Sequence, residues 1–433
     1  MHTPLTDRRR ADVAPDSGLV ETGVPPYQWS VRASQDVAYD VRMVDGLLHP
    51  ENRTLIEAGT THRTDRPRRF IVIDANIHQL YGPALRRYLD HHNCHYELCV
   101  LPASEENKTM DLVFAVLRGL NSFGISRRHE PIIAIGGGVL LDIVGLASSL
   151  YRRSTPYVRV PTSLIGLVDA GVGAKTGVNF EHHKNRLGSY FPSVVALLDR
   201  SFLATLDDRH ISNGMAEILK IGLVKDWCLF ELLEEYAEVL LEERLEGLTP
   251  IGDAVARNVF SRAIGGMLEE LQPNLWENTL ERLVDYGHSF SPTLEMRALP
   301  TLLHGEAVCI DMALTTMLAE GRGLVTGSDR RRILDVMRRL NLPIWHPLCE
   351  SGLLKEALHD TIRHRDGLQR IPLPAGIGDA RFVNDLTVVE LSRAAETLRE
   401  LGRPKDLKPS PAWVSHRRAR VHDYRNDGNK ESA

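Results

Sequence analysis

Short apolar runs that alternate with helical patterns fill the first half of this chain. Residues 70–74 (FIVID), 96–101 (YELCVL) and 131–135 (PIIAI) are such runs. Continuous apolar runs of this length are typical of strands that are buried on both faces of a parallel sheet. The alternation therefore predicts an α/β layer, in which helices cover a mostly parallel sheet.

The pattern changes after about residue 207. Apolar residues then recur at helical spacing over residues 210–245, 252–272, 304–322 and 328–340, with few strand-like runs between them. A chain of 433 residues also exceeds the size at which one hydrophobic core usually keeps growing. We therefore expect two domains between two tails. The expected parts are a polar N-terminal tail (1–34), an α/β domain (35–206), a mainly α-helical domain (207–402) and a basic C-terminal tail (403–433).

Composition excludes several classes of function. The formal net charge is -5 at pH 7 and the sequence pI is about 6.4, so we expect no nucleic-acid partner. The 5 cysteines are odd in number and lack a repeated spacing, which argues against a disulfide framework and for a reducing cytoplasm. Neither the N-terminus nor any later segment has an apolar run of membrane-spanning length, so we predict neither export nor membrane insertion.

A glycine-rich turn follows the third apolar run. Residues 133–142 (IAIGGGVLLD) place glycines directly before a helical pattern, where backbone and a helix N-terminus can approach a pyrophosphate. A strict dinucleotide fingerprint would need glycine at the position of Leu141, so a merely tight strand-helix turn explains the segment equally well. Asp74, at the end of the first run, could accept from a ribose hydroxyl or cap the following helix.

Residues 169–179 (DAGVGAKTGVN) and 184–186 (KNR), which we call the anion segment, interleave small and basic residues. The glycines let the backbone approach an anion, while Lys175, Lys184 and Asn185 bring charge and hydrogen-bond donors. The alternative is a solvated basic loop. We favour anion binding because the lysines are spread among small residues rather than clustered as a charge run.

Glu217, His288 and His304 can supply three protein ligands to one divalent metal ion. A catalytic metal needs such a set, because it keeps one position open for substrate. Each residue alone has an ordinary explanation: a histidine is usually a surface or core residue, and Glu217 three before Lys220 is typical of an exposed ion pair. The histidines at 91–95 (HHNCH) also look metal-like, but no phosphate or nucleotide motif is near them, and we interpret them as a polar helix end.

With these motifs, the chain resembles the sugar phosphate cyclase superfamily, which includes 3-dehydroquinate synthase, and within it the 2-epi-5-epi-valiolone synthases. The resemblance covers about residues 35–400. The segments that carry it are 136–142 (GGGVLLD), 151–153 (YRR), 159–163 (RVPTS), 169–179, 183–188 (HKNRLG), 213–220 (NGMAEILK), 269–276 (EELQPNLW), 285–288 (DYGH) and 303–308 (LHGEAV).

The resemblance implies the fold of dehydroquinate synthases, a Rossmann-like nucleotide-binding domain followed by a mainly α-helical domain that binds metal and substrate. It implies NAD as cofactor, zinc or cobalt on the three metal ligands, a sugar phosphate as small-molecule partner, and a homodimer in which Arg153 reaches the neighbouring subunit's phosphate site. The implied catalytic and substrate-binding residues are Asp169, Lys175, Lys184, Asn185 and Lys220. The implied NAD-binding residues are Asp74, Asn76, Glu105, Lys108, Gly137, Gly138, Asp142, Thr162, Ser163, Lys184, Phe202 and Thr205.

Two departures from the dehydroquinate synthase pattern concern the substrate. Those enzymes place a lysine and an arginine before the Gly-His motif to hold a substrate carboxylate, and Met267 and Glu281 occupy these positions here. A carboxylate would face no cation there, which disfavours it by on the order of several kcal/mol, whereas a neutral hydroxymethyl ketone avoids this penalty. Pro292 also replaces a second histidine, so the phosphate must be held differently.

These departures favour sedoheptulose 7-phosphate as substrate. The resemblance implies 2-epi-5-epi-valiolone as product, with loss of phosphate. The implied route is transient oxidation by NAD, β-elimination, reduction, ring opening and an intramolecular aldol addition. The 2-epi-valiolone and desmethyl-4-deoxygadusol synthases are alternatives on the same substrate. A metal-dependent polyol dehydrogenase is an alternative of another class, but a phosphate-free alcohol does not require the anion segment.

Overall fold

The computed structural model describes residues 18–21, 29–60, 66–181 and 183–402. It forms two compact units, Met1–Tyr39 and Asp40–Ala433. In the first unit, β1 (Gly18–Glu21) and β2 (Trp29–Arg32) pair as an antiparallel sheet. The expected N-terminal tail therefore contains a small sheet, which its sequence did not reveal because the period-two pattern is only a few residues long. The predicted basic tail at 403–433 lies outside the described residues.

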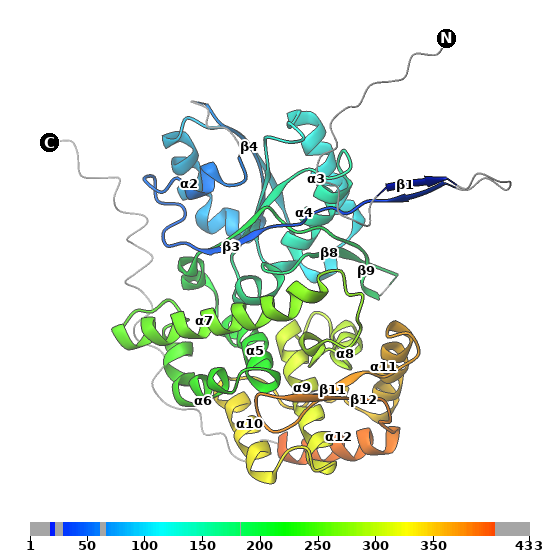
Figure 1. The fold of residues 1–433 in the computed structure, drawn as a ribbon. Coiled ribbons are helices and arrows are strands. Elements are labelled where there is room, and N and C mark those ends of the chain that lie inside the picture. The colour runs from blue at the N-terminus through cyan, green and yellow to red at the C-terminus, as the bar shows by residue number, and fades with distance from the viewer. Residues whose placement is uncertain (1–17, 22–28, 61–65, 182, 403–433) are drawn as a thin grey trace. The chain divides into compact units, whose positions relative to one another are not determined.

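A parallel sheet of six strands forms the centre of the α/β part of the second unit (Figure 1). Every neighbouring pair of strands in it runs parallel. The strands predicted at 70–74, 96–101 and 131–135 are confirmed as β4, β5 and β6. In spatial order the strands are β3 (Asp40–Met43), β10 (Val195–Leu198), β7 (Tyr157–Pro161), β6 (Ile132–Gly136), β4 (Arg68–Asp74) and β5 (His95–Leu101).

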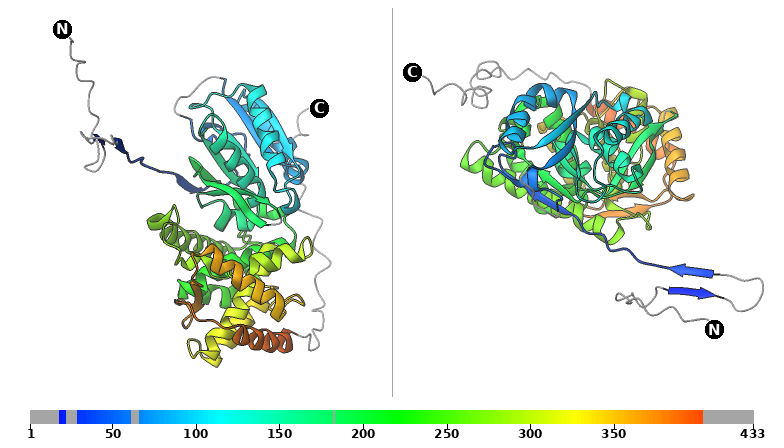
Figure 2. Two further views of the ribbon diagram at one scale, coloured as in Figure 1. Left: turned by 90° about the vertical axis from the view of Figure 1, so that its right-hand side faces the viewer. Right: turned by 90° about the horizontal axis from the view of Figure 1, so that it is seen from above.

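Alternate residues of the central strands bury their side chains on opposite faces of this sheet, as the period of two requires. Ile71 and Ile73 belong to one buried cluster with Tyr88, whereas Phe70 and Val72 belong to another. Helices therefore cover both faces, and Figure 2 shows this arrangement from two further directions. The helices are α1 (Thr54–Glu57) and α2 (Ala75–His91) on the first face, and α3 (Met110–Phe123) and α4 (Gly138–Leu150) on the second. Of the histidine-rich stretch, His91 ends α2 and His92 is its C-cap, as predicted, whereas His95 begins β5.

The order of the strands reverses between β4 and β6. From β4 the chain passes through α2 to β5 on one side, and then through α3 to β6 on the other side. Such a reversal leaves a crevice at the carboxyl ends of the two strands, where open α/β sheets bind their ligands. Asp74 ends β4 and Gly136 ends β6, and a Cβ atom built on Gly136 would lie 3.2 Å from the Cβ of Asp74.

The anion segment leaves the sheet after β7. It begins in a π-helical turn, η2 (Gly166–Ala170), and continues in an antiparallel hairpin of β8 (Lys175–Phe180) and β9 (His183–Tyr190). Gly145 of α4 lets this hairpin approach, because a Cβ atom there would overlap the side chain of Thr176. The remaining short helical turns of this part are η1 (Glu105–Asn107) and η3 (Arg200–Thr205).

The rest of the unit is mainly helical, as predicted. Residues 211–224 of α5 are all buried, which is typical of a helix at the centre of a helical core. The same core cluster includes Leu164 and Leu203 from the α/β part, and the expected boundary at 206/207 stays a prediction. The elements are α5 (Asp208–Val224), α6 (Trp227–Glu242), α7 (Pro250–Leu271), η4 (Gln272–Asn274), η5 (Leu283–Asp285), α8 (Ser291–Ala298), α9 (His304–Gly321), α10 (Gly327–Arg339), α11 (Ser351–His364), β11 (Ile371–Pro374), β12 (Ala380–Val383) and α12 (Val388–Gly402).

Helices α5 and α9 approach each other most closely at Gly305, since a Cβ atom built there would overlap the carbonyl oxygen of Asn213. The Asn213 side chain also accepts a hydrogen bond from the backbone N–H of Gly305, at 2.7 Å. We expect Gly305→Ala to lower the free energy of unfolding by about 1–3 kcal/mol, because the two helices must separate. Urea denaturation followed by circular dichroism measures this change.

Gly321, on the same helix, provides the matched control. A Cβ atom there meets nothing within 4 Å, so Gly321→Ala should leave stability unchanged or raise it by about 0.5–1 kcal/mol through helix propensity. Equal stability of the two variants would contradict the close approach of α5 and α9.

Candidate active site

Glu217, His288 and His304 come together although they are far apart in the sequence. Glu217 lies in the middle of α5, His304 is the first residue of α9, and His288 follows the turn η5. Their ligand atoms all lie within 4.8 Å of one another. The Nε2 atoms of His288 and His304 are 3.7 and 3.3 Å from Glu217 Oε1. We call these residues the metal-ligand cluster.

Each imidazole is oriented by a hydrogen bond at its other nitrogen. His304 Nδ1 lies 2.9 Å from Glu295 Oε2, and His288 Nδ1 lies 3.1 Å from the carbonyl oxygen of Tyr286. Carboxylate and carbonyl partners of this kind fix the tautomer of a metal-binding histidine and direct its free nitrogen to the metal. Both Nε2 atoms are thus presented to the space beside Glu217.

Glu217 is a buried carboxylate with a nearby countercharge. Its side chain is fully buried, and its oxygens accept no hydrogen bond of good geometry from the described residues. Lys220 Nζ lies 2.5 Å from Oε2. Burial alone would raise the pKa of Glu217, but Lys220 and the two imidazoles lower it well below its ordinary value. An ionised carboxylate with free acceptor oxygens beside two oriented imidazoles fits a zinc or cobalt ion.

The two histidines titrate differently before a metal binds. Burial lowers the pKa of His288 to about 3, so its imidazole is neutral at physiological pH. Burial and Lys184 also act to lower the pKa of His304, but Glu295 and Glu217 raise it to about 9. Binding of a metal at neutral pH must therefore displace a proton from His304, which makes metal affinity increase with pH.

Glu295 was not predicted from the sequence, which carries no motif around it, yet its carboxylate holds both His304 and Lys184. We expect Glu295→Gln to weaken metal binding about 10- to 100-fold, because the neutral amide cannot support the His304 imidazole as the carboxylate does. Competition with a chromophoric chelator measures the affinity. Glu356→Gln, which changes an exposed ion pair with Arg297, is the matched control and should bind metal like the wild type. Unchanged affinity in Glu295→Gln would contradict the assigned role.

Arg159 of β7 holds the start of the anion segment. Its side chain is completely buried, and its guanidinium donates to the carbonyl oxygens of Ala170, Gly173 and Lys175. Asp169 lies just before these residues, and burial raises its pKa although the Lys220 charge opposes this shift. A carboxyl group that keeps a proton more readily is suited to hydrogen bonding with substrate hydroxyl groups.

Lys184 and Asn185 of β9 face two different neighbours. Lys184 Nζ lies 2.5 Å from Glu295 Oε1 and 3.2 Å from His304 Nδ1, so it joins the anion segment to the metal-ligand cluster. Asn185 Oδ1 accepts from Lys108 Nζ at 2.6 Å, and the same ammonium group lies 2.6 Å from Asp142 Oδ2. Asn185, an expected phosphate-binding residue, thus contacts Lys108, which is expected to bind NAD and which pairs with Asp142.

Several of the expected nucleotide-binding residues follow the carboxyl ends of β4, β6 and β7. Asp74 accepts from the backbone N–H groups of Asn76 and Ile77, so it caps α2, which was the alternative to ribose binding. Gly137 precedes the first turn of α4, and a Cβ atom on it would lie 3.5 Å from Ser163 Oγ. The first residue of α4, Gly138, is closer to its neighbour: a Cβ atom built on it would lie 3.0 Å from the Cβ of Ala170. Gly138 thus allows close approach between α4 and the segment after β7.

The other expected cofactor residues occupy the same end of the sheet. Thr162 donates its backbone N–H to Gly136 at 3.0 Å. Glu105 Oε1 accepts from the side chain of Asn179 at 2.9 Å. Phe202 is buried with its ring 5.0 Å from that of Tyr81, whose hydroxyl lies 3.1 Å from Thr205 Oγ1.

The residues expected to contact the substrate differ in how far their side chains are buried. Met267 is buried in the helical core, and Glu281 and Arg153 are exposed, Arg153 with a left-handed backbone. Arg282, the residue after Glu281, has a mostly buried guanidinium that forms ion pairs with Glu277 and Asp285. The expectation that a substrate carboxylate would face no cation at Met267 and Glu281 stays a prediction.

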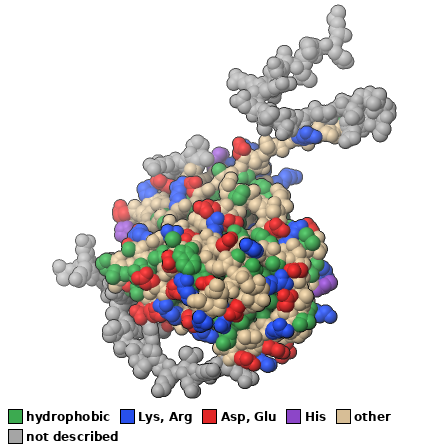
Figure 3. Space-filling model, turned by 60° about the horizontal axis from the view of Figure 1, so that its bottom comes forward, with side chains coloured by type: hydrophobic (Ala, Val, Ile, Leu, Met, Phe, Trp, Pro, Cys, Tyr) green, Lys and Arg blue, Asp and Glu red, His purple; other side chains and the backbone are tan. Residues whose placement is uncertain are grey.

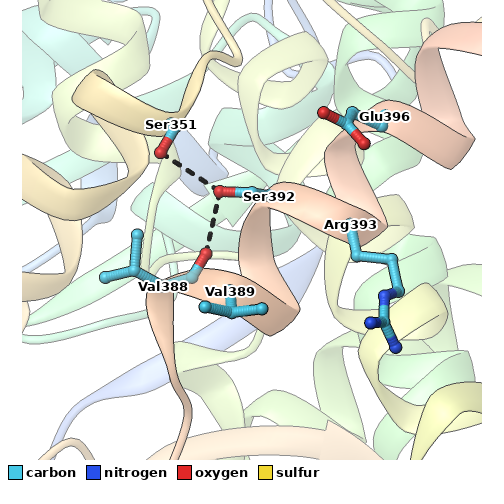
Figure 4. Close-up of a pocket in the computed structure, with 6 residues that line it drawn as sticks. All are labelled: Ser351, Val388, Val389, Ser392, Arg393 and Glu396. Atoms are coloured by element: carbon cyan, nitrogen blue, oxygen red, sulfur yellow. Dashed lines mark hydrogen bonds between the residues drawn. The ribbon is translucent and has the colours of Figure 1, made fainter.

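One surface depression lies apart from the residues described above. A depression between α11 and α12 is lined by Ser351, Val388, Val389, Ser392, Arg393 and Glu396, and it shares no residue with the sites above (Figure 4). On the face seen in Figure 3, acidic and basic side chains are intermixed. No described helix combines the length and apolarity that crossing a membrane requires.

Comparison with known proteins agrees with this geometry. Residues 98–213 match the N-terminal family of 3-dehydroquinate synthase, and residues 214–363 match its C-terminal family. The chain belongs to the 3-dehydroquinate synthase family. It is 74% identical over 375 residues to a 2-epi-5-epi-valiolone synthase of Actinomyces sp, a match that covers 87% of this chain and 98% of the relative.

Solved structures show the same relationship. ValA, the 2-epi-5-epi-valiolone synthase of Streptomyces hygroscopicus subsp. jinggangensis 5008, was solved with NAD+ and Zn2+ bound. It is 56% identical, has a TM-score of 0.82, and the match covers 86% of this chain and 100% of that chain. A 2-deoxy-scyllo-inosose synthase solved with NAD+ and Co2+ has a TM-score of 0.70 and covers 84% of this chain and 97% of its own, but at 19% identity it shows the shared fold alone.

Proposed function

We infer that this chain is a 2-epi-5-epi-valiolone synthase, which cyclises sedoheptulose 7-phosphate with loss of phosphate. The observation that carries the inference is the meeting of the metal-ligand cluster with the anion segment through Lys184, which lies within 3.2 Å of His304. A polyol dehydrogenase would need the metal ligands but not the lysines. The 74% identity to a 2-epi-5-epi-valiolone synthase supports the particular product.

Bound NAD would accept a hydride and return it, and a bound zinc or cobalt ion would acidify a substrate hydroxyl. The residues of this chain position the sugar phosphate for these steps. Lys175, Lys184 and Asn185 hold the phosphate, and their charge and donors stabilise it as it leaves. Asp169 and Lys220 hydrogen-bond the hydroxyl groups of the sugar ring next to the metal-ligand cluster. Held in this way, the two ends of the opened chain meet in an intramolecular aldol addition.

The test is incubation of the metal-loaded enzyme with sedoheptulose 7-phosphate and a catalytic amount of NAD. The expected result is one phosphate released per sugar consumed, no net accumulation of NADH, and a cyclitol that NMR identifies as 2-epi-5-epi-valiolone. A product of 2-epi-valiolone or desmethyl-4-deoxygadusol would reassign the enzyme within the family. Accumulation of NADH without release of phosphate would favour a dehydrogenase.

The assembly and location of the enzyme belong to the same proposal. We propose that it acts as a homodimer in the cytoplasm, with Arg153 directed to the phosphate site of the second subunit. The exposed position of Arg153 supports this role.

A further inference from the structure

One oxygen of a single carboxylate is shared by two cations at the edge of the anion segment. Glu277 Oε1 forms ion pairs with both Lys175 Nζ and Arg282 Nη1. The Glu277 and Arg282 side chains are each 11% exposed, whereas that of Lys175 is 55% exposed. Arg282 and Glu277 are therefore largely shielded from solvent, whereas Lys175 is accessible to a ligand from solvent.

The charges of this group are balanced internally. Asp285 forms a second ion pair with Arg282, so Lys175 and Arg282 face Glu277 and Asp285. We call these residues the Glu277 cluster. Without Glu277, two neighbouring cations would share one carboxylate, and the excess positive charge would favour an anionic ligand with several acceptor oxygens.

The backbone and neighbours of Glu277 indicate that surrounding contacts hold its carboxylate against Lys175 and Arg282. Glu277 has a φ of 54°, in the left-handed region that residues other than glycine rarely adopt. It lies in the stretch between η4 and η5, outside regular helices. Tyr190 of β9 donates its hydroxyl to Glu277 Oε2 at 3.0 Å, and its ring meets that of Trp276 edge-on at 6.1 Å. A strained residue held by contacts with a substrate-binding hairpin is typical of a functional site.

We propose that Lys175 and Arg282 form a subsite for a phosphate monoester, and that the Glu277 carboxylate occupies this subsite until the substrate phosphate displaces it. This inference rests on the proposed function, because it takes Lys175 as part of the phosphate site. Glu277 keeps two cations close together in the free enzyme and gives way to a ligand with more charge and more acceptor oxygens. Arg282 thereby supplies a bidentate donor that the family pattern does not place at this position.

Binding of inorganic phosphate to the zinc-loaded, NAD-bound enzyme tests the proposal by isothermal titration calorimetry. We expect Glu277→Gln to bind phosphate about tenfold more tightly than the wild type, because the apparent affinity of an occupied site is reduced by the fraction of time it is free. Tyr190→Phe removes one bond that holds Glu277 inward and should tighten binding by a smaller factor. Unchanged or weaker binding in Glu277→Gln would overturn the proposal.

Two further variants make the result specific. Glu396→Gln changes the net charge equally at an exposed position on α12 (Figure 4) and should bind phosphate like the wild type. Adding Arg282→Gln to Glu277→Gln should weaken phosphate binding at least tenfold relative to Glu277→Gln alone, and equal affinity would remove Arg282 from the subsite. The readout needs no turnover, so an enzyme that forms a different cyclitol, or none, still answers the question.

Discussion

Replacing His288 with alanine is expected to remove the bound metal and to lower turnover of sedoheptulose 7-phosphate at least about 10³-fold. A metal that polarises substrate oxygen contributes several kcal/mol to catalysis, and each 1.4 kcal/mol corresponds to a factor of ten. His288 is the cleanest ligand to remove. Its neutral imidazole is oriented by the backbone carbonyl of Tyr286, whereas loss of Glu217 would leave Lys220 buried without this carboxylate.

Metal content per subunit after dialysis, measured by mass spectrometry, and steady-state kinetics check this expectation together. His359→Ala, at an exposed histidine of α11, should keep both metal and activity. Circular dichroism establishes that both variants are folded. A His288→Ala enzyme that retains its metal and full turnover would refute the ligand assignment.

A carboxylated substrate, a heptulosonate 7-phosphate, is expected to react with a kcat/KM about 10³-fold below that of sedoheptulose 7-phosphate. The lysine and arginine that would hold its carboxylate are replaced by Met267 and Glu281. Arg282 does not substitute for them, because Glu277 and Asp285 engage its guanidinium in the free enzyme and the 7-phosphate takes the place of Glu277 in the proposed subsite. An unpaired carboxylate next to Glu281 loses its hydration without gaining a cation, at a cost on the order of several kcal/mol.

Parallel assays with the two sugar phosphates, following released phosphate, measure this ratio. The comparison is matched because both substrates carry the same 7-phosphate, so a loss specific to the carboxylate cannot arise at the phosphate site. Efficient conversion of the heptulosonate to dehydroquinate would overturn the interpretation of Met267 and Glu281.

The fold followed from the sequence wherever a pattern was long and continuous. The strands β4 and β6 were predicted because both of their faces are buried, which gives each a continuous apolar run. The edge strand β5 is partly exposed and was predicted from the mostly apolar residues 96–101. The helices α5, α7, α9 and α10 were predicted by their spacing. The sheet of β1 and β2 was missed, because strands of four residues carry too little periodicity to be told from a polar tail.

The candidate site was predictable only where its residues lie in short sequence motifs. The metal ligands and the lysines lie in short, distinctive segments. Glu295 and Glu277 do not, because their importance arises from contacts with residues about a hundred positions away, Lys184 and Lys175. Arg282 gains its importance from its ion pair with Glu277, which the sequence did not single out. For Asp74, the sequence offered two interpretations, ribose binding and helix capping. The hydrogen bond from Asn76 shows that Asp74 caps α2.

The buried guanidinium of Arg159 has a mechanical consequence. It ties the carbonyl oxygens of Ala170 and Lys175, before and at the start of β8, to β7, the strand that Thr162 and Ser163 follow. A displacement of β7 would therefore carry the anion segment with it. Lys175, which we expect to bind phosphate, and Thr162 and Ser163, which we expect to bind NAD, would then move as one rigid part.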